Sequence, residues 1–263
     1  MSEFDTPDYG RRFGGVSRLY GETALKKFQA SHICVVGIGG VGSWAVEGLA
    51  RNAVGKLTLI DLDNIAESNI NRQLHALDGQ LGMAKVSAMQ ARVKAINPAC
   101  QVNAIEEFIT ADNVGKLIPA DVDGVIDAVD DVNAKIALIL HCRQHHIPII
   151  TTGGAGGRVD ASRIQSTDLA LVHGDRLLAK VRNQLRRDFG FPKVAQSGKA
   201  KPTKFGITAV YSDEPVQTPN QTCDTDTAIS GLNCAGYGSS VCVTAPFGFM
   251  AAGLMLNGLA QKI

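Results

Sequence analysis

The segment ICVVGIGGVG spans residues 33–42 and places a short apolar strand directly before a glycine loop of the form G-x-G-x-x-G. In this pattern Gly37 permits a tight turn, Gly39 (followed by Gly40) lets a phosphate approach the backbone, and Gly42 allows close packing of the next helix. The N-terminus of that helix, expected over 44–51, presents amide donors and the positive end of a dipole. The segment therefore predicts a nucleotide-binding turn at the end of a buried strand.

Strand and helix patterns alternate from this loop onwards. Short branched apolar runs predict strands, and apolar residues at helical spacing predict helices. The expected strands are 33–36, 57–60, 102–105, 125–129 and 147–151. The expected helices are 44–51, 86–96 and one that follows 125–129 and runs through Leu138 to about His145. Such alternation predicts an α/β fold with a Rossmann-like, mostly parallel sheet and helices on both faces.

The regular alternation ends near residue 157. Residues 163–166 and 206–211 are expected to be antiparallel strands, separated and followed by a basic segment (176–204) and a polar segment (212–236) without clear periodicity. We expect one domain over 1–263, with a nucleotide-binding core at about 31–154 and a basic and polar, antiparallel C-terminal extension at about 158–263.

The composition is that of a folded globular chain, with 45% hydrophobic and 19% charged residues. A net charge of +1 means that any nucleic-acid affinity must come from a local patch. The six cysteines form no C-x-x-C pair, which argues against a structural zinc site and a disulfide framework and favours a reducing compartment. No apolar signal-peptide core follows the first residues, so we expect a cytoplasmic protein.

One stretch, residues 241–260, is nearly all apolar and long enough to cross a membrane. Pro246, Asn257 and its glycines weaken that interpretation without excluding it. The alternatives are a membrane contact, or a buried helix that covers the sheet or a subunit interface.

Charged residues follow the expected strand ends. Asp61 lies nineteen residues after Gly42, where a carboxylate accepts hydrogen bonds from ribose hydroxyls. Arg72 and Lys85 follow, and two such cations suit a triphosphate, whereas hydride transfer needs none. Asp127 and Asp130 end the fourth strand, so a carboxylate there could hold Mg²⁺. Taken singly, Arg72 could belong to a surface ion pair, Lys85 could be a solvated helix residue, and Asp130 could be a helix cap.

The combination of motifs resembles the adenylation domain of the ubiquitin-activating, molybdopterin-synthase and thiamine-pathway activating enzymes. The motifs are GIGGVGS (37–43), LIDLD (59–63), SNINRQ (68–73), G-x-x-K (82–85) and DAVDD (127–131), and the resemblance covers about residues 19–154. It implies ATP and Mg²⁺ as cofactors. The implied contacts are Asp61 at the ribose, Asn69, Arg72, Gln73 and Lys85 at the phosphates, and Asp130 at Mg²⁺. Asp63 and Asp127 are further candidates for binding the cofactor. It also implies a homodimer in which Arg18 is donated across the interface as a further catalytic residue.

Within this superfamily the chain resembles the bacterial tRNA threonylcarbamoyladenosine dehydratases. The matching segments are RRFGGVSRLYG (11–21), VYSDEP (210–215) and GYGSSVCVTAPFGFMAA (236–252), and the C-x-x-C pairs of the sulfur-carrier-activating relatives are missing. The resemblance implies adenylation of the threonyl carboxylate of the modified adenosine in tRNA. Internal attack then closes a ring and expels AMP.

Three further expectations concern partners. Residues 176–204 carry nine basic residues, of which Arg182, Arg186 and Arg187 are candidates for tRNA contact; a solvated surface is the alternative. Cys234 is a candidate exposed thiol, which would imply a cysteine desulfurase or a sulfur-acceptor protein as partner. The alternative functions are an adenylating, sulfur-transferring activating enzyme for a ubiquitin-like carrier protein, an NAD-dependent oxidoreductase, and a non-catalytic nucleotide-sensing protein.

Overall fold

The computed structural model describes residues 7–193, 203–217 and 237–261, and these form a seven-stranded sheet. Its strand order is β3 (Gln101–Ile105), β2 (Lys56–Ile60), β1 (His32–Val36), β4 (Gly124–Asp127), β5 (Ile149–Thr152), β7 (Thr208–Ser212) and β6 (Ile164–Asp168). Neighbouring strands are parallel except β6, which runs antiparallel to β7. The predicted Rossmann-like, mostly parallel sheet with an antiparallel C-terminal pair is confirmed.

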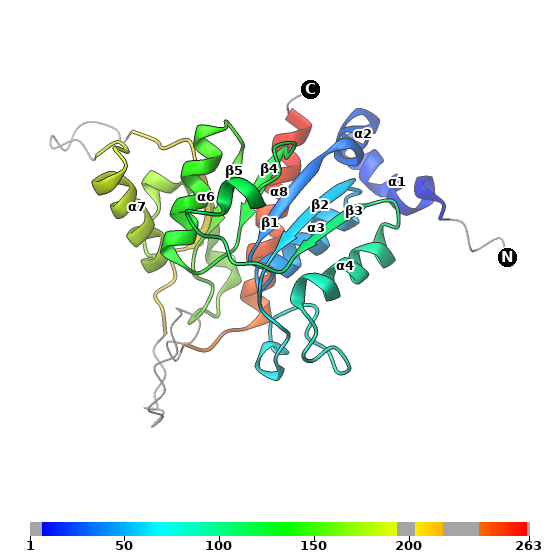
Figure 1. Ribbon diagram of the computed structural model, residues 1–263, viewed down its shortest axis with the longest axis horizontal. Coiled ribbons are helices and arrows are strands. Elements are labelled where there is room, and N and C mark those ends of the chain that lie inside the picture. The colour runs from blue at the N-terminus through cyan, green and yellow to red at the C-terminus, as the bar shows by residue number, and fades with distance from the viewer. Residues whose placement is uncertain (1–6, 194–202, 218–236, 262–263) are drawn as a thin grey trace.

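Helices cover both faces of this sheet (Figure 1). One face carries α2 (Glu22–Ala30), α3 (Gly42–Arg51), α4 (Lys85–Ile96) and α8 (Val241–Gln261), and the other carries α5 (Val114–Leu117), α6 (Val132–Gln144) and α7 (Arg176–Asp188). Short 3₁₀ turns lie at Glu67–Asn69, Ala161–Arg163 and Leu169–Leu171, named η1, η2 and η3. The first helix, α1 (Tyr9–Tyr20), lies with α2 at the end of the sheet where β1 begins.

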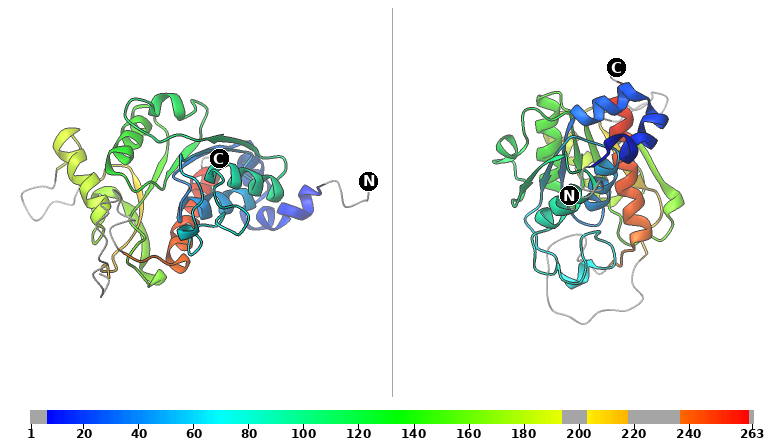
Figure 2. Two further views of the ribbon diagram at one scale, coloured as in Figure 1. Left: turned by 60° about the horizontal axis from the view of Figure 1, so that its bottom comes forward. Right: turned by 90° about the vertical axis from the view of Figure 1, so that its right-hand side faces the viewer.

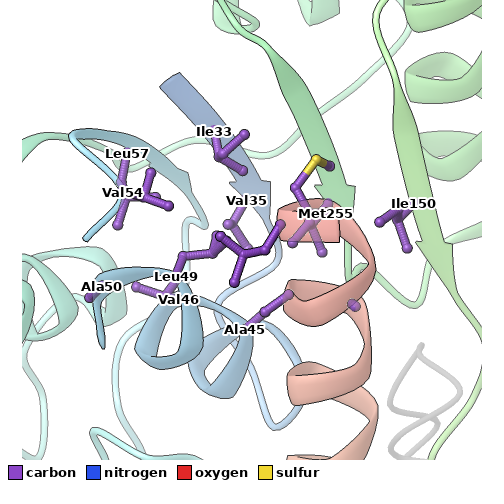
Figure 3. Packing of buried hydrophobic residues seen from close by; sticks show 14 of the residues in the cluster. Ile33, Val35, Ala45, Val46, Leu49, Ala50, Val54, Leu57, Ile150 and Met255 are labelled. Carbon is purple, nitrogen blue, oxygen red and sulfur yellow. The ribbon is translucent and has the colours of Figure 1, made fainter. Parts of the chain in front are cut away.

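The fully buried strand β1 shows why this order is stable. Its side chains alternate between the two faces, so Ile33 and Val35 join one hydrophobic cluster while Cys34 and Val36 join the other. Figure 3 shows Ile33 and Val35 packed among residues of α3 and Met255 of α8. A strand buried on both faces reads as a continuous apolar run, which is why it was predictable.

The apolar stretch forms α8, which runs along one face of the molecule (Figure 2) and packs against α3. Among the described residues, α8 is the one helix that is long and apolar enough to cross a membrane. Half of its most apolar 18-residue segment is buried inside the protein. The packing is close: a Cβ on Gly248 would lie 2.3 Å from the Val41 carbonyl oxygen. Packing against α3 and the sheet accounts for the apolar residues on the buried half of this helix.

The basic segment differs from expectation because its first half is the regular helix α7. Leu177, Leu178, Val181 and Leu185 form a buried stripe on that helix, while its basic residues occupy the other face. The density of charge masks the stripe in the sequence. Helices α1 and α2 were likewise not predicted.

Candidate active site

A cavity of about 650 Å³ opens at the carboxyl ends of β1, β2, β4 and β5. Ligands of parallel α/β sheets bind at this edge. Its lining includes Gly37, Gly39 and Gly40 after β1, Asp61 and Asp63 after β2, and Asp130 after β4. The structure therefore brings together most of the residues that the sequence analysis selected.

The glycine loop has the geometry that its sequence requires. Gly37 has a φ of 84°, and a Cβ on it would lie 2.8 Å from the carbonyl group of Ala128 after β4. A Cβ on Gly42, the first residue of α3, would lie 1.8 Å from the Gly37 carbonyl oxygen. Side chains at these two positions would force β1, β4 and α3 apart. The α3 N-terminus thus faces the cavity at close range.

Asp61 is fixed by backbone donors on two sides. Its carboxylate accepts hydrogen bonds from the Ile38 N–H (2.6 Å) and the Asp63 N–H (2.9 Å). Burial raises the pKa of this carboxyl, although Lys85 and the two N–H donors oppose the rise. Asp61 therefore holds the glycine loop in place and also lines the cavity.

Lys85 is the buried first residue of α4, and it also lines the cavity. Its Nζ lies 2.6 Å from Oδ2 of the exposed Asp63. The two residues thus form an ion pair at the cavity.

The segment around η1 contributes Asn69, Arg72 and Gln73 to the lining. The Asn69 side chain accepts from the Ala66 N–H (3.0 Å), and Arg72 Nη1 donates to the Ser68 carbonyl oxygen (2.8 Å). Gln73 is buried, and its Oε1 has no hydrogen-bond partner in the part of the chain that the structure describes.

Trp44 is a supporting residue that sequence reasoning missed. Its Nε1 donates to the Arg72 carbonyl oxygen (2.9 Å) and so joins α3 to the segment that follows η1. The single tryptophan of the chain, two residues past the glycine loop, was the available signal.

The two aspartates at the end of β4 differ in their surroundings. Asp130 lines the cavity, but Asp127 is fully buried and absent from the lining. The Asp127 carboxylate lies 3.1 Å from Lys135 Nζ and accepts from Thr151 Oγ1 (2.6 Å) and the Val129 N–H (3.2 Å). Asp127 thus lies outside the cavity lining with its oxygens engaged in the turn that carries Asp130, and its contact with the cofactor stays a prediction.

A second wall of the cavity was not predicted. This β5 wall consists of residues 153–156, Arg158, Asp175, Arg176 and Tyr237. Asp175 caps α7 by accepting from the Leu178 N–H (2.9 Å), and it also accepts from the Gly154 N–H (3.0 Å). The run GGAGG at 153–157, directly after a buried strand, was the signal that could have indicated it.

The remaining predicted residues lie elsewhere. Arg18 is exposed on α1, outside the cavity lining. Arg182 and Arg186 are half-buried. Arg182 donates to the Val172 carbonyl oxygen, and Arg186 donates to the carbonyl oxygens of Pro192 and Ala170. Arg187 is exposed beside Asp188. Two of the three arginines thus serve the fold around α7.

The cysteines divide by burial. Cys34 and Cys142 are buried; desolvation raises the pKa of both thiols, that of Cys142 to about 12. Cys242 is exposed. Cys234, the candidate thiol, lies outside the described residues. Within the described ranges no group of three or more His, Cys, Asp or Glu residues could hold a metal ion.

Comparison with known proteins agrees with this geometry. Residues 9–261 match the ThiF family model. The tRNA threonylcarbamoyladenosine dehydratase of Escherichia coli is 44% identical over 100% of this chain and 98% of its own length. The Haemophilus influenzae protein of the same name is 46% identical over 97% of this chain and 95% of its own length.

A solved structure of the Escherichia coli dehydratase in complex with ATP superimposes with a TM-score of 0.84, covering 98% of this chain and 97% of that one at 44% identity. The molybdopterin-synthase adenylyltransferase of Haemophilus influenzae is 33% identical over 51% of this chain and 54% of its own length. Because the family model covers nearly the whole chain and the dehydratases match it over almost their full length, the chain belongs to the ThiF family, in its branch of tRNA threonylcarbamoyladenosine dehydratases.

Proposed function

We propose that this chain catalyses the ATP-dependent dehydration of threonylcarbamoyladenosine in tRNA through an acyl-adenylate of the threonyl carboxylate. The observation that carries the proposal is the convergence of the glycine loop, Asp61, Arg72, Lys85 and Asp130 on one cavity. The full-length likeness to dehydratases, one of them solved with ATP, supports the choice of substrate.

The reaction has two steps. A carboxylate oxygen of the threonyl group attacks the α-phosphorus of ATP, and pyrophosphate leaves. An atom of the same modified side chain then attacks the activated carbonyl carbon, loses its proton and expels AMP. The original carboxylate oxygen leaves with AMP, so the nucleoside loses the elements of one water.

We assign the nucleotide to the β2 side of the cavity. The base packs near Phe108 and Ile109 after β3, and the ribose hydroxyls donate to Asp61, assisted by Asp63. The phosphates lie over the glycine loop at the α3 N-terminus, where amide donors and the helix dipole favour negative charge.

The polar side chains around the glycine loop contact the phosphates in this arrangement. Lys85 and Arg72 stabilise the charge that develops when the α–β phosphate bond breaks, and electrostatic stabilisation of this kind accounts for most of the rate enhancement in phosphate chemistry. Asn69 and Gln73 complete the contacts, and the unpartnered Oε1 of buried Gln73 suits a donor on the ligand or on an ordered water.

Mg²⁺ fits the residues present. Mg²⁺ is usually held by one or two carboxylates together with substrate phosphates, and Asp130 supplies a cavity-lining carboxylate of this kind. When bound, the ion offsets charge on the phosphate oxygens. The buried hydrogen-bond network of Asp127, Lys135 and Thr151 fixes the turn from which Asp130 projects.

The remaining proposals concern partners. tRNA contacts the exposed basic residues of α7, notably Arg187, since Arg182 and Arg186 are engaged with backbone carbonyls. The chain acts as a homodimer in which Arg18 enters the partner's cavity. Ring closure consumes no thiol, so it needs neither Cys234 nor a sulfur-acceptor partner.

The decisive experiment is mass spectrometry of tRNA nucleosides after incubation of modified tRNA with the protein and ATP. We expect threonylcarbamoyladenosine to lose one water, with AMP and pyrophosphate formed in equal amounts. Hydrolysis of ATP without change in the nucleoside, or dehydration without ATP, would exclude the proposal.

A further inference from the structure

The β5 wall holds a buried arginine whose donors are mostly unused. Arg158 is 3% exposed and lines the cavity. Its Nη2 donates to Asp175 Oδ2 (3.2 Å) and to the Gly174 carbonyl oxygen (3.5 Å). Its Nε and Nη1, which carry three N–H donors, have no partner among the residues that the structure describes.

The backbone around Arg158 is held from several directions. The Glu214 carboxylate accepts from the Val159 N–H (3.1 Å) and the Asp160 N–H (3.0 Å). The Gly157 N–H donates to the Gly238 carbonyl oxygen (2.7 Å). The guanidinium is therefore placed by a rigid loop, which is the condition for a preorganised binding group.

A purely structural role does not account for this arrangement. Buried polar groups in native proteins are almost always hydrogen-bonded, and an unsatisfied buried donor is costly. One oxygen of Asp175 and a single carbonyl leave most of the Arg158 fork unused. The free donors therefore call for oxygen atoms from outside the described residues, and they line a cavity that a substrate can enter.

We propose that Arg158, with the α7 N-terminus and Arg176, forms the subsite for the substrate carboxylate that is adenylated. This inference rests on the proposed function and names the part of the cavity that receives the second reactant. Asp175 offsets the charge of Arg158, while the α7 dipole and exposed Arg176 leave the wall attractive to an anion. A guanidinium is the side chain best suited to a planar carboxylate.

The position in the sheet separates this subsite from the triphosphate. The groups assigned to the phosphates follow β1 and β2 or begin α4, whereas Arg158 follows β5, and β4 lies between β1 and β5. The nucleotide and the carboxylate can thus approach each other from opposite walls. Tyr237 accepts a hydrogen bond from Arg176 (3.2 Å), which places an aromatic ring beside the subsite.

The test compares two tRNAs of identical sequence, one with threonylcarbamoyladenosine and one with unmodified adenosine, in their binding to the full-length protein with AMP. Wild type should prefer the modified tRNA. Arg158→Gln should weaken modified-tRNA binding, and raise KM for it, by about 10- to 100-fold, while Kd for ATP and for unmodified tRNA stay within about twofold. Arg163→Gln removes a nearby exposed arginine paired with Asp213, outside the cavity lining, and should change none of these values.

Arg158→Lys keeps a cation beside Asp175 but lacks the Nε and Nη1 donors, so it should show an intermediate loss. The lysine variant also replaces the glutamine variant if that one fails to fold. A further binding measurement needs no variant, because it uses the wild-type protein and tRNA whose threonyl carboxylate is a methyl ester. If Arg158→Gln weakened ATP binding, Arg158 would be assigned to the triphosphate. If it weakened the binding of both tRNAs equally, Arg158 would be assigned to RNA phosphates. Either result would overturn the carboxylate subsite. Unchanged KM in an active protein would reject the subsite alone, whereas absence of dehydration by wild type would reject the proposed function.

Discussion

Single side chains around the cavity differ in whether they bind substrate or act on the transition state. In the proposed arrangement Lys85 and Arg72 stabilise the charge that develops during loss of pyrophosphate, so replacing either with Ala should lower turnover by ~10²–10³-fold while ATP affinity changes less. Steady-state kinetics and calorimetry check this. Lys94→Ala removes an exposed lysine at the other end of α4 and should leave both quantities unchanged. Equal losses in ATP affinity and turnover would instead mark ground-state binding.

His75 gives a prediction about acid stability. Burial lowers its pKa from 6.5 to about 4, and neither ring nitrogen has a partner among the described residues. The unfolded chain therefore binds more protons than the folded one below about pH 6.5, and stability falls as pH falls. From pH 7.5 to pH 5 this group should remove about 2 kcal/mol of unfolding free energy.

Urea denaturation of His75→Leu across that pH range checks the prediction. The variant should lose about 2 kcal/mol less than wild type between these pH values. His145→Leu, at an exposed position, should follow wild type. Parallel curves for His75→Leu and wild type would contradict the assignment of acid sensitivity to this residue.

Among the elements, the contact between α8 and α3 supports the nucleotide loop. A Cβ on Gly248 would lie 2.3 Å from the Val41 carbonyl oxygen and 2.8 Å from the Ala45 nitrogen. Gly248→Ala should therefore destabilise the protein by ~1–3 kcal/mol and weaken ATP binding, since Val41 belongs to the glycine loop. Gly253→Ala has free space on the same helix and should stabilise it by about 0.5–1 kcal/mol. Urea unfolding measures the stability of both variants, and calorimetry measures their ATP binding. Loss of stability in both variants would show that α8 tolerates no added side chain.

The same elements show what a sequence alone can predict. The strand–loop–helix unit from β1 to α3, Asp61 after β2 and Lys85 at the start of α4 carry local signals, and all were placed correctly. The lone Trp44 and the GGAGG run before Arg158 are weaker signals, because their partners Arg72 and Asp175 lie 28 and 17 residues away in the sequence. The sequence also does not show that the Asp127 carboxylate pairs with Lys135 below the cavity lining.

For the whole molecule, the exposed position of Arg18 on α1 leads to a test of assembly. If Arg18 completes the partner's cavity, mixing inactive Arg18→Ala with inactive Lys85→Ala should restore activity, because each mixed dimer contains one intact site. Random exchange should return about a quarter of wild-type activity per chain. The assay needs proof of subunit exchange, for instance by native mass spectrometry. Exchange without recovery would place Arg18 outside the shared site.

The position of α8 in chain order has a consequence for biosynthesis. Every strand and the helix α3 precede residues 241–261, yet α8 covers the face that buries Ala45, Val46 and Leu49. As the chain leaves the ribosome, this apolar face stays uncovered until the last helix emerges. Nascent chains of this length should therefore depend on chaperones, and premature termination before α8 should yield aggregates rather than a smaller working enzyme.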